Sequence, residues 1–288
     1  MSWREITWNG VRFSTPAAWE VAKIGPRYLL LADQGEPALE IKWERIKGRF
    51  SHQTALRRLK SLHRDTIQES PLPEEWEKIL GDFTVKGFTW QAGAGGGRGV
   101  ILHCPACGNA TLIQFFLNFS DSNDETCRRV LASFQDHSMD SPVRWSIFDI
   151  RAEIPADYRL VRYRFEAGRF EMQFGSKGQQ ITLYRWGPAS ALLAKGDLIA
   201  FAVKTIRIHQ SGWHSLTCTG HPAVQSERSV PGGPWARCWE RMTGKPHFQW
   251  FRLWHLVEKN RVLGVGANGY KVFQSEVLNR ICTQYESL

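Results

Sequence analysis

The segment Phe13-Ser14-Thr15-Pro16-Ala17-Ala18-Trp19-Glu20-Val21 has a counterpart in the second half of the chain. In Ala152-Glu153-Ile154-Pro155-Ala156-Asp157-Tyr158-Arg159-Leu160 a Pro-Ala pair is again followed, at the same spacing, by an aromatic and then an aliphatic residue. Each proline is expected to end a strand, because it cannot donate a hydrogen bond to a strand ladder. Internal similarity of this kind indicates a repeated structural unit.

The predicted order of elements after each copy also repeats. Strands come first, then a helix, then antiparallel strands such as 214–228 and 235–241, and a closing helix. Ser51 can cap the helix of the first half, and 189–203 is the helical segment of the second. A short polar linker over 136–143 separates the halves.

These patterns predict an α+β fold with two repeated domains, each a mainly antiparallel sheet flanked by helices. The first domain covers residues 1–138 and the second covers 143–288. A chain of 288 residues is long enough for two domains of ordinary size.

The order resembles the PsbP/DcrB-like fold, which includes the Ran-release factors of eukaryotes. Gly220-His221-Pro222-Ala223 looks like the Gly-x-Pro-Ala turn of that group, and Val85-Lys86-Gly87-Phe88 is its degenerate counterpart. Because most members of the group have no catalytic site, the resemblance implies a non-enzymatic module that binds or assembles another protein. The DcrB-like branch adds the expectation of a chaperone-like role.

The composition bounds the compartment. The sequence has no apolar stretch of the roughly 18 residues that a membrane helix needs, and its first residues lack the apolar run of a signal peptide. We therefore expect a cytoplasmic protein without a membrane span. The six cysteines are then expected to be reduced, as core thiols or metal ligands.

The net charge of +9 is unevenly distributed. Residues 1–140 hold 17 basic and 17 acidic residues, which leaves 20 basic and 11 acidic residues for 141–288 out of totals of 37 and 28. The asymmetry predicts an anionic partner for the second domain, and the alternative is an ordinary solvated basic surface.

Basic and aromatic residues alternate in the second domain, which suggests a ligand surface. Arg162 and Arg164 flank Tyr163, while Trp250, Arg252 and Trp254 share one strand face at a period of two. Such a face could stack bases and hold phosphates, so a nucleic-acid or other anionic ligand is the alternative function. The competing interpretation is an aromatic core strand with arginine at its rim.

The sharpest chemical motif is Cys104-Pro105-Ala106-Cys107-Gly108, which has the form of a zinc knuckle at a hairpin tip. It supplies half of a zinc site. Cys218 and His221 are predicted to complete a Cys₃His set, with His103, Cys238 and His247 as other candidates. A metal-free hairpin is the alternative. Thiol redox chemistry is disfavoured, because it needs this motif at a helix N-terminus.

Two further patterns point away from catalysis. The glycine-rich run 92–99 lacks the Gly-Lys-Ser/Thr of a phosphate-binding loop, so it is expected to be a hairpin connection. No Gly-x-Ser-x-Gly or His-Glu-x-x-His pattern occurs. We therefore expect no enzyme, and the alternative is a zinc-containing protein with Cys104 and Cys107 in its site.

Overall fold

The computed structural model describes residues 2–62, 66–92, 95–116, 121–137, 142–208, 212–229 and 248–288. The chain divides into two compact units. Unit 1 comprises Met1–Met139 and Ser146–Phe148, and unit 2 comprises Asp140–Trp145 and Asp149–Leu288. Residues 138–141 of the predicted linker lie outside the described residues.

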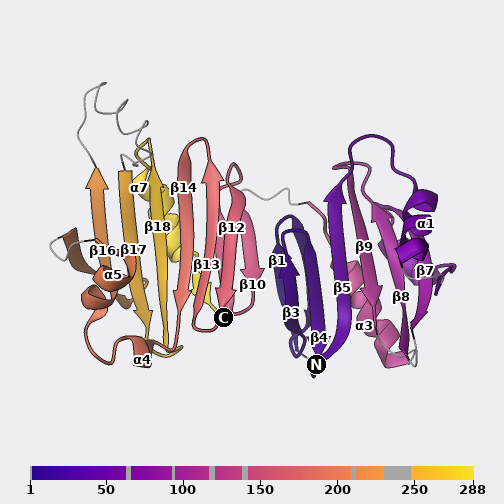
Figure 1. Ribbon diagram of the computed structural model, residues 1–288, viewed down its shortest axis with the longest axis horizontal. Helices are drawn as coiled ribbons and strands as arrows, with labels where there is room; N and C mark the ends of the chain where they lie inside the picture. Colours follow the sequence, from indigo (N-terminus) through magenta and orange to yellow (C-terminus); the bar gives the residue numbers. More distant parts are fainter. Residues whose placement is uncertain are drawn as a thin grey trace. The chain divides into compact units, whose positions relative to one another are not determined.

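Unit 1 is built on one seven-stranded antiparallel sheet with the order β3-β4-β5-β9-β8-β7-β6 (Figure 1). The hairpin of β1 and β2 precedes it and belongs to another, five-stranded sheet, which also includes β10, β11 and β19. The elements are β1 Trp3–Trp8, β2 Val11–Pro16, β3 Glu20–Gly25, β4 Tyr28–Asp33, β5 Glu36–Arg45, α1 His52–Leu62, β6 Ile67–Glu69, α2 Glu74–Ile79, β7 Thr84–Ala92, β8 Gly95–His103, β9 Asn109–Phe115 and α3 Asp121–Ala132.

Unit 2 has a seven-stranded antiparallel sheet with the order β12-β13-β14-β18-β17-β16-β15. The elements after α3 are β10 Val143–Ile147, β11 Ile150–Ile154, β12 Arg159–Glu166, β13 Arg169–Ser176, β14 Gln179–Trp186, α4 Ala189–Leu192, α5 Leu198–Ile206, β15 Trp213–Cys218, β16 His221–Ser229, β17 Phe248–Leu256, β18 Arg261–Gly269, α7 Ser275–Thr283 and β19 Glu286–Ser287. β10 spans the division between the units.

The two large sheets have the same strand order, position by position. In each sheet three consecutive strands lie side by side, β3–β5 in unit 1 and β12–β14 in unit 2. The next neighbour in space is the last strand of that sheet, β9 or β18, and the remaining strands follow in reverse order of sequence. The predicted α+β fold with mainly antiparallel sheets is confirmed. The predicted strand ends are confirmed too, since β2 ends at Pro16 and β11 ends just before Pro155.

The sheet of unit 1 buries both faces, but unequally. On one face Leu56 and Leu59 of α1 pack against Phe88 and Ile101. The register pairs Ile101 with Leu112, Leu112 with Lys42 and Lys42 with Tyr28, so all of these residues share the α1 face. Because α1 lies over β6 and β8, the β4–β5 part of that face carries no helix in the described residues.

The opposite face is the main core of unit 1. Val100, Ile113 and Phe115 lie on it, fully buried, and α3 contributes Val130 and Leu131 to the buried set. Full burial of one large aliphatic or aromatic side chain stabilises a fold by about 1.5–3 kcal/mol, so this face dominates the stability of the unit.

Two predicted elements of unit 2 are corrected. The single helix predicted over 189–203 is two helices. The first, α4, ends at Leu192, and α5 begins after Asp197, which caps it by accepting a 2.8 Å hydrogen bond from the Ala200 amide. The single strand over 214–228 is the hairpin of β15 and β16, turned at Thr219 and Gly220, whose φ angles are 49° and 83°. The predicted strand 235–241 lies outside the described residues.

The part of the chain that the structure describes includes no helix long and apolar enough to cross a membrane. The predicted cytoplasmic location stays a prediction.

The glycine-rich run is part of the β7–β8 hairpin. Gly95–Gly99 lie in β8 and pair with β7 and β9. A Cβ added to Gly97 would lie 1.9 Å from the Phe115 carbonyl oxygen, which explains why this strand position has no side chain.

We expect Gly97→Ala to lower the free energy of unfolding by about 1–3 kcal/mol in urea denaturation, because the added carbon overpacks the β8–β9 pair. Gly81→Ala is the matched control. Its Cβ would meet no atom closer than 3.5 Å, so its effect should stay within about 0.5 kcal/mol. Equal stability of the two variants would contradict this account of the run.

Candidate functional site

The cysteine motif closes the β8–β9 hairpin, as predicted. The Cys104 amide donates to the Asn109 carbonyl at 2.9 Å, and the Gly108 amide donates back to the Cys104 carbonyl at 2.9 Å. Gly108 has a φ of 74°, a left-handed conformation that glycine adopts at no steric cost. The tight turn holds both thiols at the same end of the hairpin.

Two further side chains reach this turn from the segment after α3. The Asn109 side-chain amide donates to the Asp136 carbonyl oxygen at 2.8 Å. The Cys107 thiol donates to Asp136 Oδ2 at 3.1 Å, and His137 Nδ1 lies 2.6 Å from Asp136 Oδ1. Cys104 Sγ lies 3.8 Å from the same His137 nitrogen.

The four side chains form one compact donor cluster, in which each contributed sulfur, nitrogen or oxygen atom lies within 4.8 Å of the others. Its members are Cys104, Cys107, Asp136 and His137, and we call it the Cys-Asp-His cluster. Burial, the Asp136 carboxylate and the Cys104 thiol raise the pKa of Cys107 to about 12, against a lowering by the Asn109 amide. Without a metal this thiol is protonated at neutral pH, which does not suit a nucleophile.

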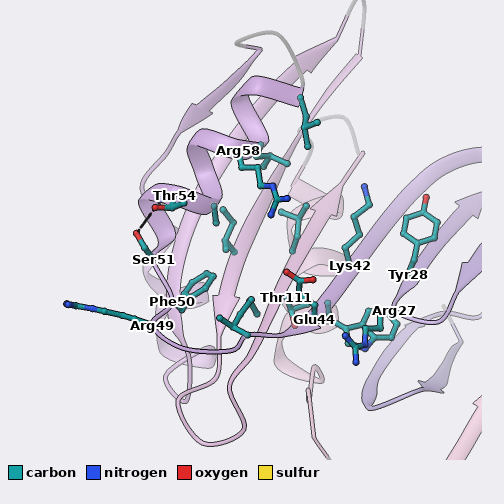
Figure 2. Close-up of a pocket in the computed structure, with 18 residues that line it drawn as sticks. Arg27, Tyr28, Lys42, Glu44, Arg49, Phe50, Ser51, Thr54, Arg58 and Thr111 are labelled. Carbon is teal, nitrogen blue, oxygen red and sulfur yellow. Dashed lines mark hydrogen bonds between the residues drawn. The ribbon is translucent and has the colours of Figure 1, made fainter.

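A groove of about 720 Å³ lies on the α1 face of unit 1, beside α1 and over β4, β5 and β9 (Figure 2). Its apolar lining consists of Trp43, Ile46, Phe50, Ala55, Leu59, Leu62, Ile101, Ala110 and Leu112. Its polar lining consists of Arg27, Tyr28, Lys42, Glu44, Arg49, Ser51, Thr54, Arg58 and Thr111. We call this feature the α1 groove.

The charge of the α1 groove is positive, since four cationic residues and one carboxylate line it. Arg58 extends from α1 into the groove, and Lys42 and Glu44 lie on the strand β5 that faces it (Figure 2). Lys42 Nζ lies 3.0 Å from Glu40 and 5.5 Å from the centre of the Tyr28 ring. Burial and a hydrogen bond with Glu40 raise the pKa of Tyr28 to about 12, so its hydroxyl stays protonated.

The predicted ligands Cys218 and His221 lie in unit 2, where they pair across the β15–β16 turn. Cys218 is buried beside Cys282 and Arg252. Neither Cys218 nor His221 is needed to complete a four-ligand set, because unit 1 supplies Asp136 and His137. Of the other candidates, His103 stacks on Phe50 at 4.6 Å, while positions 238 and 247 lie outside the described residues.

The two tryptophans of the predicted ligand surface are buried. Trp250 and Trp254 are only 4% and 0% exposed, and Trp254 packs edge-on against Tyr285 at 5.8 Å. Arg252 covers the Trp250 ring at 5.0 Å and donates to Gln225 at 2.9 Å. Strand alternation placed these residues on one face, but that face is part of the core.

The two arginines of that predicted surface are exposed on β12, at the edge of the sheet. Arg164 pairs with Glu166 at 3.1 Å. The anionic-ligand role predicted for Arg162 and Arg164 stays a prediction.

The cations of the α1 groove give no signal when charge is compared over whole halves of the chain. Residues 42–60 contain seven basic residues and only Glu44 as an acid, within a half that is neutral overall. A shorter window would have found this segment. Asp136 and His137 gave no such signal, because they looked like part of a polar linker.

Neither the sequence models of protein families nor the curated proteins contain a match to this chain. Among solved structures it is similar to the Ran-binding protein Mog1p of Saccharomyces cerevisiae, with 10% identity and a TM-score of 0.32 over 52% of this chain and 96% of that one. A Mog1 mutant gives the same identity and score over 51% and 96%. A Bacteroides thetaiotaomicron protein gives 10% and 0.32 over 84% and 93%.

At this TM-score the likeness does not bear on function.

The thiols of Cys218 and Cys282 in unit 2 are joined by a hydrogen bond, whose effect can be measured by titration. A hydrogen bond from Cys282 lowers the pKa of Cys218 to about 7, with a smaller contribution from Arg252. Cys282→Ala removes that donor, so the Cys218 pKa should rise toward its usual value of 9.0. Ultraviolet thiolate absorbance against pH, compared with Cys218→Ala, measures the shift.

Cys127→Ala is the control for that titration, because burial raises the pKa of Cys127 to about 12 and it lies in unit 1. An unchanged Cys218 midpoint in Cys282→Ala would show that the two thiols are not coupled.

Proposed function

We propose that this protein is a non-enzymatic protein-binding module, of the assembly or chaperone-like kind, and that the α1 groove binds an acidic, partly apolar segment of its partner. The observation that carries the proposal is a groove of about 720 Å³ with an apolar floor and four cationic residues around it. Ligand-binding clefts commonly have this size and this combination of apolar lining and few polar groups.

The apolar floor supports a protein segment as the ligand. Leu62 at the end of α1 is 72% exposed, and it is the one large hydrophobic residue of unit 1, within the described part, that is exposed to solvent. It lines the groove together with the buried Leu59. Leu62 therefore continues the apolar lining of the groove to its solvent-exposed edge, which enlarges the apolar area that a partner segment would bury.

The charge arrangement supports an acidic segment. Arg27 follows β3 and Arg58 lies on α1, so the cations come from separate elements around the floor (Figure 2). No ion pair involves Arg27 or Arg58 within the described ranges. Such spread-out cations suit several carboxylates along a peptide, and they would steer its association.

The corresponding face of unit 2 is already filled. There α5 packs Phe201 and Ala202 onto Trp186 and Leu253, with Tyr184 and Phe251 partly buried beside them. In unit 1 the strand in the place of β14 is β5, and it carries Lys42 on this face. This contrast supports unit 1 as the binding unit.

The matching strand orders support a second, finer proposal, that the chain is a tandem of PsbP/DcrB-like domains. In this view duplication preserved the sheet, and the two copies then diverged in what covers it.

Selection from a phage library of random linear peptides tests the binding proposal. We expect the full chain to enrich peptides that combine Asp or Glu with apolar residues. Arg27→Glu with Arg58→Glu should weaken the best peptide about tenfold or more in calorimetry, because each reversal changes an exposed ion pair by up to about 1 kcal/mol and repulsion replaces attraction.

The matched control is Arg57→Glu with Lys60→Glu, which makes the same charge change on α1 outside the groove lining. It should leave the peptide affinity within about twofold. Peptides without acidic residues, or equal losses in both double variants, would contradict the proposal. A single-stranded oligonucleotide that binds the groove more tightly, with steep salt dependence, would also contradict it.

A further inference from the structure

We propose that the Cys-Asp-His cluster binds one Zn²⁺ ion, as a structural site that joins the β8–β9 hairpin to the segment after α3. This site goes beyond the proposed binding function, and it lies wholly within unit 1.

The donor set fits zinc. Thiolate sulfur, imidazole nitrogen and carboxylate oxygen are the ligands that zinc takes in proteins, and four of them complete its tetrahedral shell. Around such an ion the donor atoms lie about 3–4 Å apart. The four donors of the cluster already lie within 4.8 Å of one another, so only small side-chain rotations are needed.

The buried carboxylate of Asp136 favours a cation beside it. Its side chain is 1% exposed, and within the described residues its ion-pair partner is His137 rather than a lysine or arginine. A buried carboxylate costs several kcal/mol unless charge and hydrogen bonds compensate it. A zinc ion at the cluster supplies two positive charges beside it.

The backbone holds the two halves of the cluster together without the ion. Arg12 and Gln135 exchange two backbone hydrogen bonds of 2.8 Å, which fixes the residue before Asp136 against β2. The Asn109 side chain then ties Asp136 to the hairpin. Because this scaffold positions the ligands in advance, the cost of ordering them on binding is reduced.

The site has the features of a structural centre. Four protein ligands leave no open position for a substrate or water, unlike catalytic zinc sites, which keep one open. Cys104 and Asp136 are buried, while His137 is exposed enough to let an ion enter from one side. Zinc takes cysteine as the thiolate, so metal affinity at a site with cysteine ligands rises with pH.

The test is metal analysis of the full chain purified without added metal. We expect about one zinc per chain, little in Cys104→Ser, and an affinity at least about tenfold lower in His137→Gln, measured against a competing chelator. Even the loss of a group that only orients a ligand weakens metal binding about 10- to 100-fold. Because His137 is exposed, His137→Gln should fold normally even if Cys104→Ser does not.

Cobalt spectroscopy and control variants test which residues bind the ion. Cobalt(II) substituted for zinc should give a visible absorption that changes in His137→Gln, which a merely structural role of that residue would not produce. The double variant Cys218→Ser with His221→Gln, and the neighbouring His103→Gln, should keep full zinc. Absence of zinc, a Cys104–Cys107 disulfide in its place, unchanged affinity in His137→Gln, or loss of zinc in the Cys218 and His221 variant would each overturn the proposal.

Discussion

The structure of unit 1 depends on the pairing of β5 with β9. Seven residue pairs run from Leu39 with Phe115 to Arg45 with Asn109, and Ile41 faces Ile113 at the buried centre. This pairing joins the first three strands of the sheet to the strands that follow α1, so closing the sheet requires a long-range contact. In unit 2 the pairing of β14 with β18 has the same place in the sheet.

Both candidate sites lie on this strand pair. Asn109, the first residue of β9, follows the cysteine turn and donates to the carbonyl of Asp136. Three pairs further along, Leu112 and Lys42 lie side by side in the floor of the α1 groove. A zinc ion at one end of β9 would therefore stabilise the strand that lines the α1 groove. The two sites are then coupled through β9.

Local signals in the sequence predicted the fold well. Pro16 and Pro155 mark strand ends because proline lacks an amide donor, and Ser51 precedes α1 and accepts a 3.3 Å hydrogen bond from the Thr54 amide. The cysteine hairpin was also predicted, since its turn chemistry is contained in five residues. Two predicted elements were wrong. Residues 193–197 divide the helix predicted over 189–203, and the turn at Thr219 and Gly220 divides the strand predicted over 214–228.

What the sequence could not give is which segments cover one another. The alternation that groups Trp250 with Trp254 defines a strand face, but only the tertiary structure shows that this face is buried. Asp136 contacts Cys107 across 29 residues of chain, and Lys42 and Arg58 line the same groove because α1 covers only part of the sheet. These are consequences of tertiary packing, for which no local pattern exists.

Mapping of backbone amide chemical shifts, with an acidic and partly apolar peptide added to the full chain, tests whether the α1 face of unit 1 is the functional surface of this protein. We expect the largest shifts on β5, β9 and α1, around Lys42 and Arg58. Largest shifts in unit 2, for example on β12 around Arg162, would contradict it.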